Sequence, residues 1–166
     1  MVCSAGLSKK VMNAARSPRT LSTVAPIIFG LIVVLALLSI IGRWPHQFGG
    51  QGDPDHIIQE LLTSGTATAP PLPILIVFGV VAWAVRRADR WGVAARILLI
   101  PLAVLMAVGA IGEAAAPASP DVPRLVQLGN GVFGVVAAAL LAVLAVASLT
   151  HRSAPGRVAG VHAEGR

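Results

Sequence analysis

The stretch 83-WAVRRADRWG-92 places three arginines and one aspartate between two long apolar segments, and Arg96 follows shortly after. Read alone, Arg86, Arg87, Arg90 and Arg96 are typical of a nucleic-acid patch, and a pI of about 11.4 favours that interpretation. The chain as a whole has a mean hydropathy of +0.80. The explanation of the arginines therefore has to start from the apolar segments on either side of them.

Those apolar segments are long enough to cross a membrane. Of the 166 residues, 55% are hydrophobic and only 12% are charged, whereas soluble domains carry about 25% charged residues. A helix needs about 20 apolar residues to cross a hydrocarbon core of ~30 Å. Only helices and closed barrels satisfy their backbone there, and these segments lack the period-two alternation of barrel strands. The sequence predicts an all-α integral membrane bundle with four transmembrane helices, over about 21–42, 70–85, 92–113 and 125–150.

The cations are divided unevenly between the two sides of this predicted bundle. One side carries only Arg43 and Arg124. Positive residues in short loops stay cytoplasmic, so both termini are expected in the cytoplasm. The stretch at 83–92 is then a tight cytoplasmic turn, held by attraction to anionic lipid. The basic residues are spread over short segments next to the membrane, so no nucleic-acid binding is expected. The cytoplasmic cations are Lys9, Lys10, Arg16, Arg19, Arg86, Arg87, Arg90, Arg96, Arg152, Arg157 and Arg166.

The four predicted helices divide the chain into an arm, a transmembrane domain and a tail. Residues 1–20 form a basic cytoplasmic arm in which Met12 is an alternative start, 21–150 form the transmembrane domain, and 151–166 form a flexible cytoplasmic tail. The first apolar segment is longer than a signal-peptide core and lacks a small-residue cleavage site, so it is expected to remain as an anchor. Eleven arginines against two lysines indicate a bacterial protein, and hence a location in the bacterial plasma membrane.

The outer loop, residues 43–69, contains the most polar cluster. The segment 53-DPDHIIQELL-62 predicts a short amphipathic helix, with Asp53 as N-cap and Pro54 at the first helical position. His46, Asp53, Asp55 and His56 are residue types that bind divalent cations. Their spacing matches no established metal site, and capping already explains the two aspartates. A metal site is therefore not predicted, and metal binding or pH sensing by these four residues is an alternative interpretation.

The ends of the third helix carry two more ionisable residues. Arg96 is expected one turn inside the helix, with its guanidinium reaching back to the headgroups. Glu113 is expected to end this helix at the outer headgroups, and its burial in the membrane is the alternative. Glu113 could also pair with Arg124 across the outer mouth of the bundle.

Small residues recur along the fourth helix at the spacing of one helical face. Gly134, Ala138 and Ala142 lie four residues apart, and Gly131 lies on a neighbouring row. Small residues at this spacing let helix backbones approach closely in lipid. The fourth helix is expected to pack in this way against the third, or against a partner protein.

The layout resembles that of DoxX-like proteins, with four helices, both termini inside and a longer first outer loop. The acidic residue expected within the second helix of such proteins is absent here.

No catalytic constellation is found, no cofactor is predicted, and Cys3 is the single cysteine. The first functional hypothesis is therefore a structural or accessory subunit, which contacts lipid and binds other membrane proteins or itself through its small-residue faces and outer loop. The alternatives are an oligomeric transporter or channel for lipid or a small solute, and an outward-facing metal or pH sensor.

Overall fold

The structure is a computed structural model, and it describes residues 18–47, 49–50 and 52–150. The predictions for the arm up to residue 17, for the start at Met12 and for the tail 151–166 lie outside the described residues.

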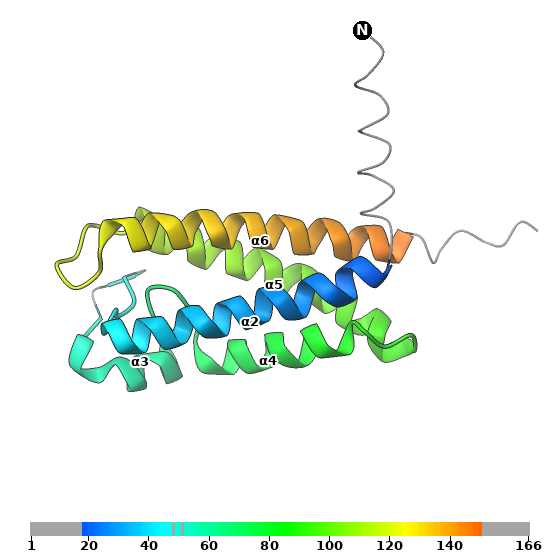
Figure 1. The fold of residues 1–166 in the computed structure, drawn as a ribbon, viewed down its shortest axis with the longest axis horizontal. Coiled ribbons are helices and arrows are strands. Elements are labelled where there is room, and N and C mark those ends of the chain that lie inside the picture. Colours follow the sequence, from blue (N-terminus) through cyan, green and yellow to red (C-terminus); the bar gives the residue numbers. More distant parts are fainter. Residues whose placement is uncertain (1–17, 48, 51, 151–166) are drawn as a thin grey trace, which may run out of the picture.

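All regular structure in the described part of the chain is helical. Apart from helices, these residues form only two isolated β-bridges, which join Pro45 to Thr66 and Thr66 to Ala69. Helices α2, α4, α5 and α6 run side by side, and α3 lies at one end of them (Figure 1). The elements are α2 (Pro18–Gly42), the 3-10 turn η1 (Pro54–His56), α3 (Ile57–Thr63), α4 (Leu72–Ala84), α5 (Arg90–Ala115) and α6 (Arg124–Thr150).

Three of these helices, α2, α5 and α6, are long and apolar enough to cross a membrane. Helix α4 has 13 residues, so at 1.5 Å per residue it is about 20 Å long. Pro70 and Pro71 hold the preceding chain outside the helix, and Pro73 occupies its first turn, where a missing N–H leaves no helical bond unmade. The architecture is that of a helical membrane protein with three helices of spanning length, where the sequence predicts four.

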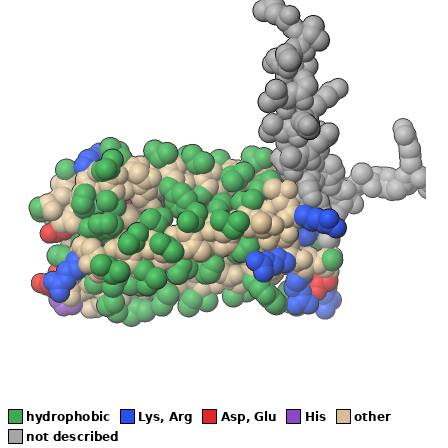
Figure 2. Space-filling model, viewed as in Figure 1, with side chains coloured by type: hydrophobic (Ala, Val, Ile, Leu, Met, Phe, Trp, Pro, Cys, Tyr) green, Lys and Arg blue, Asp and Glu red, His purple; other side chains and the backbone are tan. Residues whose placement is uncertain are grey.

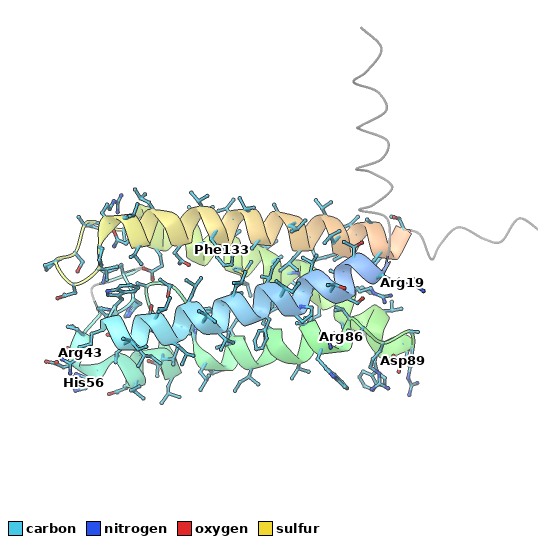
Figure 3. The ribbon with its side chains drawn as sticks, viewed as in Figure 1. Arg19, Arg43, His56, Arg86, Asp89 and Phe133 are labelled. Carbon is cyan, nitrogen blue, oxygen red and sulfur yellow. The ribbon has the colours of Figure 1, made fainter. Side chains whose placement is uncertain are left out.

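The side surface of the helices is apolar along its length. Large hydrophobic side chains are exposed on α2, α4, α5 and α6, and the charged side chains gather at the two ends of the visible face (Figure 2). Arg19, Arg86 and Asp89 lie at one end, while Arg43 and His56 lie at the other (Figure 3). Soluble proteins rarely expose an apolar surface of this extent, which instead suits contact with lipid.

Helices α5 and α6 form the most extensive helix pair. A Cβ atom added at Gly131 would lie 2.5 Å from the Cβ of Ala114, and one added at Gly134 would collide with the Cβ of Ala110. Ala138 is buried one turn further along the same face, and Ala142 is partly buried against the core. The small-residue face of α6 is thus turned toward α5 of the same chain.

A valine at Gly134 should destabilise this helix pair, because overpacking costs about 1–3 kcal/mol. Gly129 is the matched control: it also lies inside α6 but has open space around an added Cβ. Thermal unfolding in detergent, followed by circular dichroism, should give a lower melting temperature for Gly134→Val than for Gly129→Val. Equal melting temperatures would contradict the close α5–α6 packing.

Candidate functional site

The turn between α4 and α5 is fixed by short polar contacts at the arginine-rich end. Asp89 is the N-cap of α5 and accepts from the N–H of Gly92 at 3.1 Å. Its carboxylate also pairs with Arg87 at 2.9 Å. Partial burial raises the pKa of Asp89, but the bonds from Gly92 and Arg87 outweigh it and leave the pKa below its ordinary value. The Arg87 guanidinium lies 5.8 Å from the Trp83 ring, and that of Arg90 lies 5.9 Å from Trp91.

Arg96 is buried inside the bundle, whereas the sequence predicts a guanidinium that reaches back to the headgroups. Its side chain is buried, and its Nη2 donates to the carbonyl oxygens of Val85 at 3.1 Å and Arg87 at 3.3 Å. These carbonyls follow the last turn of α4, where backbone oxygens have no partner within the helix. A cation is also favoured there by the helix dipole. Arg86, Arg87 and Arg90 are exposed, so Arg96 alone of the four arginines acts as a helix cap.

Two buried carboxylates hold the outer loop at the opposite end. Glu60 accepts from the backbone N–H of His46 at 3.2 Å and from that of Asp53. Glu113, which is 8% exposed, accepts from the N–H of Gln47 with both oxygens, at 2.9 and 3.1 Å. We call Glu60 and Glu113 the carboxylate clasp. It supplies acceptors to loop N–H groups that lie outside any helix.

The segment 65–69 is inserted between the helices at the same end, and all five of its residues are buried. The hydroxyl of Thr68 donates to the carbonyl of Leu35 at 2.8 Å and contacts the hydroxyl of Ser39 at 2.5 Å. From α6, the side-chain amide of Asn130 donates to the carbonyl of Ala67 at 3.0 Å. Residues 65–69 are therefore hydrogen-bonded to α2 on one side and to α6 on the other.

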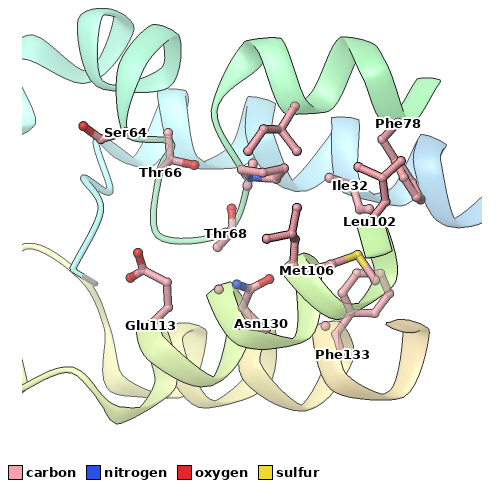
Figure 4. A pocket seen from close by; sticks show the side chains of 17 residues that line it. Ile32, Ser64, Thr66, Thr68, Phe78, Leu102, Met106, Glu113, Asn130 and Phe133 are labelled. Atoms are coloured by element: carbon pink, nitrogen blue, oxygen red, sulfur yellow. The ribbon is translucent and has the colours of Figure 1, made fainter. Parts of the chain in front are cut away.

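A cavity of about 150 Å³ lies beneath this segment. Polar side chains gather at one end of the cavity and apolar side chains line the rest (Figure 4). Ile74 of α4 and Leu105 of α5 also line it and are exposed, so the cavity reaches the apolar side surface between α4 and α5. The polar end is formed by Thr66, Thr68, Glu113 and Asn130, and the apolar wall includes Ile32, Phe78, Leu102, Met106 and Phe133.

The hydroxyl of Thr66 is the least satisfied polar group of this cavity. Thr66 is 3% exposed, and its Oγ1 has no hydrogen-bond partner among the described residues. A buried hydroxyl without a partner costs about 1–3 kcal/mol. This cavity, with a buried carboxylate and an unsatisfied hydroxyl at one end, is the candidate binding site.

The four residues considered for metal binding do not converge. Asp53 binds His56 at 2.7 Å, Asp55 binds Arg43 at 3.3 Å, and the imidazole of His46 lies 3.3 Å from Glu60. Within the described residues, no group of three histidine, cysteine, aspartate or glutamate side chains is placed to hold a metal ion. Asp53 is instead the cap that the sequence predicts, and it accepts from the N–H of Asp55 at 2.9 Å.

The possible pair of Glu113 and Arg124 does not form either. Arg124 donates to the carbonyl of Ala116 at 2.8 Å and to the side-chain oxygen of Gln127 at 2.9 Å. Ala116 is the C-cap of α5, so Arg124 satisfies a helix-terminal carbonyl, as Arg96 does at α4. Glu113 points into the bundle and lines the cavity, away from that contact.

Glu60 of the carboxylate clasp and Thr66 of the cavity carry little signal in the sequence. Glu60 reads as a surface residue of an amphipathic helix, and Thr66 belongs to a plain threonine-alanine linker. Asn130, in the first turns of an apolar helix, has the stronger signal, because an amide there is costly unless it is bonded.

Comparison of the chain with protein-family models, with curated proteins and with solved structures gives no match.

The pair of Asp53 and His56 makes part of the stability of the folded protein depend on pH. The hydrogen bond and the charge of Asp53 raise the pKa of His56 above its ordinary 6.5, while bonds from Asp55 and His56 lower the pKa of Asp53. The contribution of His56 to stability is therefore complete below pH 6.5 and is lost as the pH rises through its folded-state pKa, while that of Asp53 is complete above pH 3.8 and is lost as the pH falls through its folded-state pKa.

Nuclear magnetic resonance titration of His56 should give a pKa above 6.5, and Asp53→Asn should return it toward 6.5. Asparagine is a good N-cap, so the variant removes the charge and keeps the cap. An unchanged pKa in Asp53→Asn would refute the pairing.

Proposed function

We propose that this chain is a multi-pass protein of the bacterial plasma membrane, with four crossings and both termini in the cytoplasm. The distribution of cations supports the orientation: Arg19 and Arg86 lie at the end opposite to Arg43 (Figure 3). Arg87 and Arg90 belong to the turn that follows Arg86, whereas Arg124 begins α6 at the outer-loop end (Figure 1). The arginine composition of the chain supports the bacterial assignment.

The fourth crossing is assigned to α4, although this helix is short. It packs against α2 and α5 and carries the chain from the outer-loop end back to the arginine-rich end (Figure 1). A short span is accommodated by local thinning of the bilayer and by flanking side chains that reach the interface. The exposed Trp83, Arg86 and Arg87 at its C-terminal end are of this kind.

In this membrane the protein binds a small amphiphile, taken from the lipid phase between α4 and α5. The observation that carries this proposal is the cavity itself, which has an apolar wall, a polar end and an opening on the lipid-facing side. Ligand sites combine apolar surface with a few fixed polar groups. The volume of about 150 Å³ equals that of engineered apolar cavities which hold benzene. Binding of this kind favours the alternative function of a transporter for lipid or a small solute.

An accessory-subunit role is the second candidate, and a different observation favours it. Ile58 and Leu62 on α3 are 58% and 49% exposed at the outer-loop end, which suits contact with a partner. The small-residue face of α6 no longer supports this role, because Gly131 and Gly134 pack against α5.

Filling the cavity should abolish binding. Gly109 lines the cavity and has open space around an added Cβ, so Gly109→Leu places its side chain in the ligand volume. Gly129→Leu on α6 is the matched control outside the cavity. Saturation-transfer magnetic resonance with benzyl alcohol, on protein in phosphatidylcholine nanodiscs, should show saturable binding to the wild type and to Gly129→Leu. Gly109→Leu should lose at least about tenfold in affinity.

The amphiphile proposal fails if benzyl alcohol gives no saturable signal with the wild type. It also fails if Gly109→Leu and Gly129→Leu bind the probe equally.

A further inference from the structure

The polar end of the cavity is built mainly from hydrogen-bond acceptors. The carboxylate of Glu113 lines it and is buried, and an ionised carboxylate accepts hydrogen bonds but cannot donate them. Gln47 donates to Glu113 from the loop side through its backbone N–H. The two oxygens of a carboxylate offer about four acceptor positions.

The neighbouring side chains reinforce that character. Asn130 donates one of its two amide N–H groups to the carbonyl of Ala67, and its side-chain oxygen is an acceptor. Thr68 has its hydroxyl proton committed to the carbonyl of Leu35. Thr66 adds a hydroxyl that is buried at 3% exposure and has no partner in the described part of the chain. The polar end can therefore receive more hydrogen bonds than it can give.

The two arginines of the outer end, Arg43 and Arg124, bond to other groups. Arg124 donates to Ala116 and Gln127, and Arg43 pairs with Asp55. A ligand that carries its own positive charge would place it beside the buried carboxylate. Charge-assisted hydrogen bonds of this kind are about twice as strong as neutral ones.

We propose that the ligand is a small amphiphile with a primary ammonium head, which binds Glu113, Thr66 and the side-chain oxygen of Asn130. This inference rests on the proposed amphiphile site and names the chemistry of its ligand. An ammonium group offers three donors, which matches these three acceptors. The apolar body contacts Phe78, Met106 and Phe133, and the cavity volume limits it to about the size of one aromatic ring.

The test compares three probes that share a ring and differ in the head group: benzylamine, benzyl alcohol and benzoate. Phosphatidylcholine nanodiscs are used because these lipids carry no primary ammonium group, and the background is the signal from Gly109→Leu. At pH 7 the wild type should bind benzylamine at least about tenfold more tightly than benzyl alcohol, since hydrogen bonds to charged groups are stronger than those between neutral groups. Benzoate should bind more weakly than both.

Two variants then test which residues produce the preference for benzylamine. Glu113→Gln keeps an acceptor for the N–H of Gln47 but removes the charge, so the preference for benzylamine over benzyl alcohol should fall to within about twofold. Thr66→Val keeps the shape of the side chain but removes its hydroxyl, and it should lower the affinity for benzylamine by about threefold. Thr66→Val also tests the site independently if Glu113→Gln does not fold, as judged by circular dichroism.

The outcomes separate this inference from the proposed function. Saturable binding of all three probes with equal affinity, lost in Gly109→Leu, would overturn the ammonium inference and leave the amphiphile site standing. Binding of none of the probes would overturn both. If benzylamine is preferred, replacing part of the lipid with phosphatidylethanolamine identifies the source of the amine: competition indicates the lipid headgroup, and its absence indicates a free amine.

Discussion

Backbone that leaves a helix inside an apolar bundle needs hydrogen-bond partners from side chains, and the rest of this structure depends on that requirement. Lipid offers no hydrogen bonds, so each unsatisfied N–H or C=O group costs several kcal/mol. The outer loop meets the requirement with Glu60 and Glu113, which accept from loop N–H groups. Asn130 donates to a loop carbonyl, and Thr68 donates from the loop to α2. The polar residues of this apolar chain are concentrated where helices are absent.

The same requirement explains the positions of two arginine side chains, which the charge pattern alone would place at the membrane interface. Arg96 donates to carbonyls beyond the end of α4, and Arg124 donates to the C-cap carbonyl of α5. It also explains the cavity. Glu113 holds the loop through both oxygens of its carboxylate, and its side chain also lines the cavity. The candidate site is thus a consequence of how the loop is closed over the helices.

Local signals predicted the helices and the Asp53 cap, because apolar length and capping chemistry act over a few residues. They could not predict the partners of Arg96 and Glu113, since those partners are backbone atoms 11 and 66 residues away. Only the packed bundle brings them close. Glu60 and Thr66 were missed for the same reason, because their roles depend on a loop whose path no periodicity describes. The pair of Glu113 and Arg124, which the sequence leaves as a possibility, does not form, because both side chains bond to backbone groups.

The central claim is that lipid surrounds these helices, with the carboxylate clasp outside the cell and the arginine turn inside. Labelling of single cysteines with a membrane-impermeant maleimide tests it most directly, in a background where Cys3→Ser removes the one native cysteine. Gln59, Ala88 and Val104 are exposed residues at the outer end, in the arginine turn and within α5. We expect Gln59→Cys to be labelled on intact cells, Ala88→Cys to be labelled only after permeabilisation, and Val104→Cys to be labelled in neither case. Labelling of Ala88→Cys on intact cells, or of Val104→Cys in intact membranes, would contradict the account.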